Sequence, residues 1–162
     1  MNKNRTFLLA LAGIFSAVVF VATFIIRVPA PTGYINLGDG VILFTAVWLG
    51  GYAVIPATVG STLADLLSFP LYAPATLVIK SLMALTAVGV LRFTKGKLVG
   101  RVVAFIMAEA LMIVGYFLYD TLVYGFGGAV ANVAGNGVQA VAGIVLGWAL
   151  SMIPRPAMRG RG

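Results

Sequence analysis

The chain has 162 residues, of which 61% are hydrophobic and only 9% are charged, and its net charge is +7. Soluble domains contain about 45–50% apolar and about 25% charged residues, so this composition predicts an integral membrane protein and excludes a water-soluble core. The chain has no cysteine and no histidine, which removes thiolate chemistry and the commonest metal ligand and general base. We therefore expect no catalytic residue, no metal site and no cofactor.

Apolar stretches cover nearly the whole chain and are separated by short breaks. Because a helical membrane span needs about 20 apolar residues, we predict an all-α bundle of six transmembrane helices that forms one integral-membrane domain over residues 1–162. The predicted helices cover about 7–28, 37–49, 52–67, 75–93, 99–123 and 131–153.

Proline and glycine mark the expected breaks. Pro29 and Pro31 end the first predicted helix at Val28, and the segment up to Asn36 is expected to be a loop. The later breaks are Gly50-Gly51, the loop 68–73, the basic turn 94–97 and the glycine-rich segment 124–128.

Most of the basic residues lie in three clusters, before the first predicted helix, between the fourth and fifth, and after the sixth. They are Lys3 and Arg5; Arg92, Lys95, Lys97 and Arg101; and Arg155, Arg159 and Arg161. If six helices alternate in direction, all three clusters lie on one side, which the positive-inside rule makes cytoplasmic. We therefore predict a multi-pass protein of the bacterial cell (cytoplasmic) membrane with both termini in the cytoplasm, and no nucleic-acid partner.

The four acidic residues, Asp39, Asp65, Glu109 and Asp120, lie within or at the ends of apolar spans, where an unpaired charge costs a few kcal/mol. Three of them fall near the outer helix ends, at the depth of tyrosines and amides in the outer loops. This grouping predicts a polar cavity for a small heterocycle. The predicted substrate-binding residues are Asn36, Asp39, Asp65, Tyr72, Lys80, Tyr116, Asp120, Asn136 and Gln139.

Each of these residues also has a purely structural interpretation. The acids can pair with Lys80 or Arg27, or cap helices. Asn136 and Gln139 are spaced i, i+3 on one helix face and can hydrogen-bond between helices. Tyrosines also populate the interfacial belts of membrane proteins.

Small residues recur four positions apart on the first predicted helix, where Ala12 precedes Ser16 and Gly13 precedes Ala17. A small-residue face lets another helix approach closely. The approaching helix belongs either to the same bundle or to another subunit, and we predict that these four residues dock a partner.

Four segments, Gly33-Tyr34-Ile35-Asn36-Leu37-Gly38-Asp39-Gly40, Gly60-Ser61-Thr62-Leu63-Ala64-Asp65, Tyr72-Ala73-Pro74-Ala75 and Lys80-Ser81-Leu82-Met83, carry a family resemblance. With the six short helices, they resemble the S components of energy-coupling factor (ECF) vitamin transporters, in the riboflavin-type, hydroxymethylpyrimidine or pyridoxine subgroup. The resemblance implies a subunit that captures a small water-soluble vitamin, with vitamin B6 or a hydroxymethylpyrimidine-like heterocycle favoured.

The same resemblance implies partners and a mode of action. An S component works with a transmembrane T component, which it contacts through its first helix, and with two cytoplasmic ATPases. It binds its ligand under the outer loops and topples in the membrane to release it inside. The chain has no Gly-x-x-x-x-Gly-Lys-Ser/Thr loop, so ATP hydrolysis is expected in the partners.

Two other functions compete with this interpretation. An ion- or proton-coupled carrier or channel would use the buried acids. An intramembrane aspartyl protease is suggested by Gly38-Asp39 and Tyr119-Asp120, but Asn36 stands where that family requires glycine and the two motifs occur in reverse order.

Overall fold

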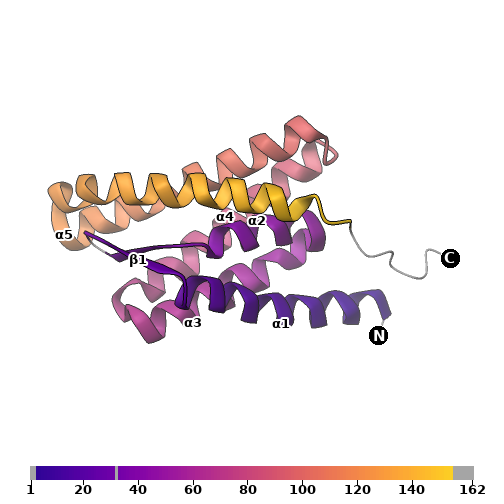
Figure 1. The fold of residues 1–162 in the computed structure, drawn as a ribbon, viewed down its shortest axis with the longest axis horizontal. Coiled ribbons are helices and arrows are strands. Elements are labelled where there is room, and N and C mark those ends of the chain that lie inside the picture. The colour runs from indigo at the N-terminus through magenta and orange to yellow at the C-terminus, as the bar shows by residue number, and fades with distance from the viewer. Residues whose placement is uncertain (1–2, 32, 155–162) are drawn as a thin grey trace.

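The computed structural model describes residues 3–31 and 33–154 and forms a bundle of helices with a small hairpin at one end (Figure 1). The expectation of a largely helical protein is confirmed. In chain order the elements are α1 (Lys3–Phe24), β1 (Arg27–Ala30), β2 (Gly33–Asn36), α2 (Gly38–Leu49), the 3-10 helix η1 (Gly50–Ala53), α3 (Val54–Ser68), the 3-10 helix η2 (Pro70–Tyr72), α4 (Ala73–Phe93) and α5 (Leu98–Ser151).

A β-hairpin follows α1, where the sequence suggested a helix to Val28 and then a loop to Asn36. α1 ends at Phe24, and β1 pairs antiparallel with β2 so that Pro29 lies opposite Tyr34. The β-branched residues after α1 favour extended backbone, and a two-stranded ribbon accepts proline because one edge of each strand needs no ladder bond. An apolar run of this kind does not distinguish the end of a helix from a strand.

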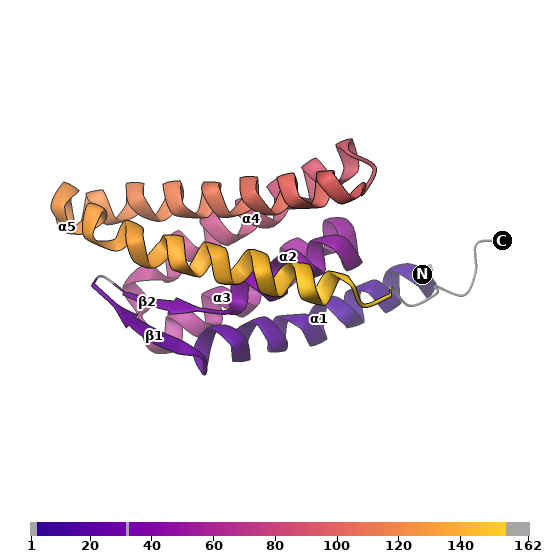
Figure 2. The same ribbon diagram turned by 45° about the horizontal axis from the view of Figure 1, so that its top comes forward.

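α5 bends back on itself at Gly125 (Figure 2). Gly125 has φ 77° and ψ 172°, a conformation that glycine adopts without a steric penalty. The two halves then run side by side, and the Asn132 side-chain amide donates to Asp120 across them at 2.8 Å. The break therefore falls inside the expected segment 124–128, but one glycine makes the whole turn, and the second half of the helix resumes directly after Gly125 rather than near residue 131.

α2 and α3 form an antiparallel pair that turns at η1, where Gly50 has φ 56°. α2 has 12 residues, or roughly 18 Å of helix, which is less than the roughly 30 Å of a bilayer's hydrocarbon core. Among the described residues, four helical stretches are long and apolar enough to cross a membrane, and one of them runs through both α2 and α3. These stretches are Arg5–Phe24, Gly38–Ser68, Pro70–Phe93 and Leu98–Ser151.

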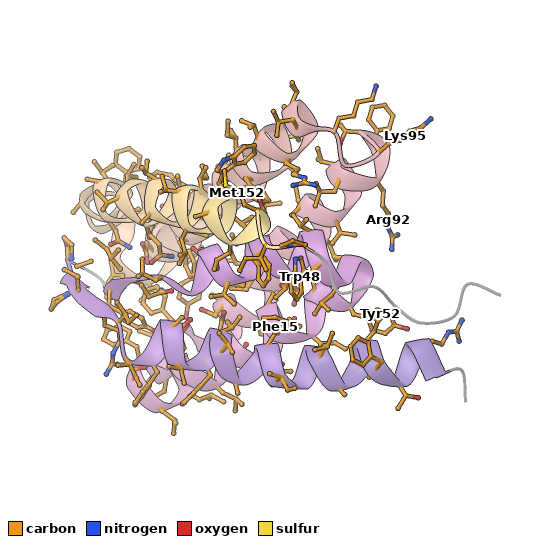
Figure 3. The ribbon with its side chains drawn as sticks, turned by 45° about the vertical axis from the view of Figure 1, so that its right-hand side comes forward. Phe15, Trp48, Tyr52, Arg92, Lys95 and Met152 are labelled. Carbon is orange, nitrogen blue, oxygen red and sulfur yellow. The ribbon has the colours of Figure 1, made fainter. Side chains whose placement is uncertain are left out.

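The bundle has two chemically different ends. The hairpin end holds the β-hairpin, η2 and Gly125, whereas the basic end holds the start of α1, η1 and the turn between α4 and α5 (Figures 1 and 2). Figure 3 shows Arg92 and Lys95 at the basic end, and Arg101 lines a cleft there with Arg92. The predicted arginines at 155, 159 and 161 lie outside the described residues.

Aromatic and small residues hold the helices together. At the basic half, Phe15 and Trp48 pack on Phe44 with ring centroids 5.5 and 4.7 Å apart, and the Trp48 indole donates to the Ile153 carbonyl at 3.2 Å (Figure 3). Gly60 of α3 lies so close to α1 that a Cβ there would clash with the Ser16 carbonyl oxygen. Close backbone approach through small residues is typical of membrane helices.

Candidate substrate-binding site

A polar cavity lies at the hairpin end, between the hairpin and the ends of the helices. Its empty volume is about 440 Å³, including the part open to the outside. The lining residues are Thr23, Gly33, Tyr34, Asn36, Ser61, Asp65, Phe69, Tyr72, Thr76, Lys80, Tyr116, Asn132, Asn136 and Gln139. Residues from the hairpin and from α1, α3, α4 and α5 thus meet around one space.

The structure brings most of the predicted site residues to this cavity. Those that line it are Asn36, Asp65, Tyr72, Lys80, Tyr116, Asn136 and Gln139. Asp39 and Asp120 do not line it; they are 1% and 0% exposed and hydrogen-bond to residues that do. Both aspartates therefore position the cavity wall.

Asp39, in the first turn of α2, organises one wall. It accepts hydrogen bonds from the Lys80 ammonium, with which it forms a buried ion pair, and from the Gln139 amide at 2.7 Å. The Gln139 carbonyl accepts from the backbone and side-chain amides of Asn36 at 2.9 and 3.0 Å. The side-chain carbonyl of Asn36 in turn accepts from the Gly38 backbone amide at 2.9 Å. This network joins the hairpin, α2, α4 and the second half of α5.

Asp65, near the end of α3, organises the opposite wall. It accepts from the Tyr34 and Thr76 hydroxyls, and Thr76 also hydrogen-bonds with the Tyr116 hydroxyl at 2.8 Å. Burial and the neighbouring Asp65 raise the pKa of Tyr34 above its ordinary value, so this phenol keeps its proton. The Lys80 ammonium lies 5.4 Å from the Tyr116 ring centroid, within cation–π range.

Asp120 and a group of tyrosines complete the site near Gly125. Asp120 accepts from the Tyr72 hydroxyl and from Asn132. The Tyr72 ring packs against Tyr116, Tyr119 and Tyr124, with centroids 6.0, 5.3 and 6.5 Å away. Because Tyr72 is 6% exposed, it serves as the centre of this aromatic wall rather than as part of a surface belt.

Two buried hydroxyls at the cavity lack partners within the described part of the chain, and a half-buried amide lies beside them. The Thr23 and Ser61 hydroxyls are buried and form no hydrogen bond there. Asn136 is half-buried in the lining. A buried polar group without a partner costs about 1–3 kcal/mol, so these groups are ready to bind a ligand or water.

The sequence interpretation missed the hydroxyl residues of the lining. Ser61 lies four residues before Asp65, and Thr76 lies four residues before Lys80, a spacing that places each pair on one helix face. That spacing would have found both residues. Thr23, by contrast, has no polar residue at such spacing within α1.

The four predicted docking residues separate into two pairs. Ala12 is 0% exposed, and Ser16 is half-buried with its hydroxyl bonded to the Ala12 carbonyl at 2.8 Å. Gly13 and Ala17 are exposed, and nothing lies within 4 Å of a Cβ built at Gly13. The face available to a partner thus runs through Gly13 and Ala17.

These features define a protein of long apolar helices with a polar cavity near one end of its bundle. Asp39 and Asp120 lie in separate hydrogen-bond networks, unlike the paired aspartates that an aspartyl protease requires. Among the described residues, no group of three acidic, cysteine or histidine side chains is placed to hold a metal ion.

Comparison with known proteins identifies the family. A family model described as "ECF-type riboflavin transporter, S component" matches residues 3–154. A protein of Pyrococcus woesei, named only "Uncharacterized protein in gap 3'region", is 39% identical over 143 residues, which cover 83% of this chain and 93% of the relative. The chain belongs to the ECF-type riboflavin transporter S-component family and is a transport subunit rather than an enzyme. The resemblance found in the sequence is confirmed.

Proposed function

We propose that this chain captures a vitamin with a single heterocyclic ring, of the vitamin B6 or hydroxymethylpyrimidine kind, in the cavity at the hairpin end. The observation that supports this most directly is the set of unpaired hydroxyls and the Asn136 amide beside the aromatic wall. Amides and hydroxyls suit the ring nitrogen and the hydroxyl groups of such a ligand, and the tyrosines suit its ring.

The charge of the cavity wall favours a ligand without strong negative charge. Lys80 is paired with Asp39, and Arg27 lies over the rings of Phe24 and Tyr34, 4.6 and 5.5 Å from their centroids. No lysine or arginine other than Lys80 lines the cavity among the described residues. A di-anionic ligand would therefore find no unpaired cation there.

Cavity size favours one ring over three. The family description names riboflavin, whose tricyclic flavin is much larger than a pyridine or pyrimidine. The cavity's empty volume is about 440 Å³, including the part open to the outside, so a flavin would require a larger displacement of the lining residues than a single ring.

Titration of the purified chain distinguishes these ligands. Pyridoxine, hydroxymethylpyrimidine and riboflavin are added separately to detergent-solubilised protein, and binding is measured by calorimetry. We expect saturable binding of one of the first two and weaker binding of riboflavin. Tight binding of riboflavin alone would overturn the single-ring assignment and leave the family function intact.

We further propose that six helical segments alternate in direction across the membrane, with the basic end in the cytoplasm and the 12-residue α2 covering only part of the bilayer's thickness. Support comes from the alternating direction of α1, α2, α3, α4 and the two halves of α5, and from the position of Arg92 and Lys95 (Figure 3). The proposed location is the bacterial cytoplasmic membrane.

Single cysteines introduced into this cysteine-free chain test the topology. With an impermeant thiol reagent added outside cells, we expect labelling at Gly127→Cys, near the bend of α5, and none at Gly96→Cys, in the basic turn. Gly127 has open space around an added Cβ, whereas Gly96 has φ 64° and strains any side chain placed there. Lys97→Cys, at an exposed position of the same turn, is therefore the second inner position, and it should also stay unlabelled. The reverse labelling pattern would show that the orientation is wrong.

The outward face of α1 is proposed to dock the T component. Gly13→Leu and Ala17→Leu are expected to reduce assembly with the T component and the two ATPases, because a bulky side chain holds two backbones apart. Vitamin binding by the isolated chain should be unchanged, since the cavity lies at the hairpin end. Copurification of the partners with tagged variants measures the effect.

Ala110→Leu is the matched control for this experiment, because Ala110 is also exposed at mid-span but lies on α5. We expect it to assemble normally. Normal assembly of both α1 variants would instead assign the small face to lipid contact.

A further inference from the structure

One buried carboxyl has no role in the cavity described above. Glu109 lies in the first half of α5, seven residues or about two turns before Tyr116, on the side away from the hairpin. It is 1% exposed, and neither of its carboxyl oxygens has a hydrogen-bond partner among the described residues. A group of this kind is costly in a bilayer interior, which makes it a candidate for function.

Glu109 lies beside the Asp39–Lys80 ion pair. Gly143, in the second half of α5, has no side chain, and a Cβ there would collide with the Glu109 carboxyl and come within 3.1 Å of the Asp39 Cβ. The charged groups that act on Glu109 are Asp39 from α2 and Lys80 from α4. The Lys80 ammonium, paired with Asp39, therefore has a second, unpaired carboxyl nearby.

The charge balance of these three groups requires one proton. With Lys80 charged and paired to Asp39, an ionised Glu109 would be a buried negative charge without a hydrogen bond, which costs several kcal/mol. If Glu109 carries a proton, the group of three is neutral. The same neutrality holds if Lys80 pairs with Glu109 and the proton moves to Asp39.

We propose that Asp39, Lys80 and Glu109 form a one-proton switch beneath the cavity, in which the proton lies on whichever carboxyl is not paired with Lys80. In the transfer, the O–H bond on Glu109 breaks, an O–H bond forms on Asp39, and the ammonium moves from Asp39 to Glu109 with no net change in charge.

The transfer would change the hydrogen bonding of the cavity wall. In the structure Asp39 only accepts, and it holds Gln139 with its amide toward Asp39 and its carbonyl toward Asn36. When Lys80 moves away, a protonated Asp39 would present a hydroxyl donor on the oxygen that the ammonium leaves. Gln139 would keep its orientation, because the Asn36 backbone amide that it accepts from can only donate. The cavity would thus have two patterns of donors and acceptors. This consequence rests on the proposed function, but the switch itself does not.

Infrared spectroscopy of the ligand-free protein tests the switch. The carbonyl stretch of protonated carboxylic acids is compared in wild type, Glu109→Gln and Asp39→Asn at neutral pH. We expect Glu109→Gln to lose a band that wild type shows. We expect Asp39→Asn to lose the same band, because Lys80 then pairs with Glu109 and ionises it.

Lys80→Met should instead strengthen the carboxylic-acid band. Neither Asp39 nor Glu109 then has a cation beside it, so both should be protonated. A band in Glu109→Gln equal to that of wild type would show that Glu109 is ionised and would overturn the proposal. A band that persists in Asp39→Asn would show a permanently protonated Glu109 with no switch.

Glu109→Gln and Asp39→Asn preserve side-chain size, so the comparison stands even if Lys80→Met fails to fold. Because no vitamin is added, failure here leaves the proposed vitamin binding untouched.

Discussion

Lys80→Met is expected to destabilise the protein by about 3–5 kcal/mol, because a buried Asp39 without its cation must either stay charged and uncompensated or take up a proton at neutral pH, and both cost free energy. Asp39 is 1% exposed and would keep only the Gln139 amide as a hydrogen-bond donor among the contacts seen here. Vitamin binding should fall with it, since Lys80 lines the cavity. Denaturant unfolding in detergent measures the first effect.

The double variant Lys80→Met/Asp39→Asn is the control for this prediction. It removes both charges and keeps a carbonyl oxygen at position 39 for the Gln139 amide, so it should recover most of the lost stability. Equal destabilisation by the single and double variants would mean that packing of the Lys80 side chain, rather than the charge pair, stabilises the bundle.

Gln139→Ala should have the second large effect, on binding and stability together. Gln139 bridges Asp39 and Asn36 through three hydrogen bonds, and its loss leaves buried partners unsatisfied at about 1–3 kcal/mol each. We expect pyridoxine affinity to fall by at least roughly tenfold, which corresponds to about 1.4 kcal/mol, and the unfolding midpoint to fall as well.

Asn136→Ala, on the same helix, is expected to affect ligand binding without affecting the stability of the protein. Asn136 lines the cavity without a hydrogen bond inside the described protein, so losing it should weaken binding by about 1 kcal/mol, or roughly fivefold, at unchanged stability. Gly137→Ala, where an added Cβ meets nothing within 4 Å, is the control. Wild-type affinity in both Asn136→Ala and Gln139→Ala would remove this part of α5 from the site.

The membrane class and the depth of the polar residues could be predicted from sequence because the bilayer penalises every buried charge. That penalty is why Asp65, Lys80 and Gln139 meet at one cavity. It does not reveal whether a side chain faces the ligand or supports a neighbour, so Asp39 and Asp120 were predicted to touch the ligand although they lie behind the wall.

The remaining errors have local causes. The hairpin was missed because its apolar, β-branched residues continue the pattern of α1, and only strand pairing, which is not local in sequence, distinguishes them. The break in α5 was predicted too long because the segment contains several glycines and only Gly125 takes the positive φ of the bend. The predicted docking face remains a prediction; the sequence could not show that Ala12 is buried and Gly13 exposed, because that depends on where α3 packs on α1.

An ion- or proton-coupled carrier is the function that competes with a binding subunit, and the buried acids are compatible with it. A carrier transports its substrate alone along an ion gradient, whereas an S component binds substrate and depends on ATPase partners for transport. The two functions make opposite predictions for the isolated chain in a membrane.

The decisive measurement is uptake of labelled vitamin by liposomes that contain this chain alone, or the chain with its T component and both ATPases. The ligand is the one selected by the titration above. We predict that the chain alone binds vitamin but does not accumulate it, with or without a proton gradient, and that accumulation requires the partners and internal ATP. Accumulation by the chain alone, driven by a proton gradient, would contradict the proposed function.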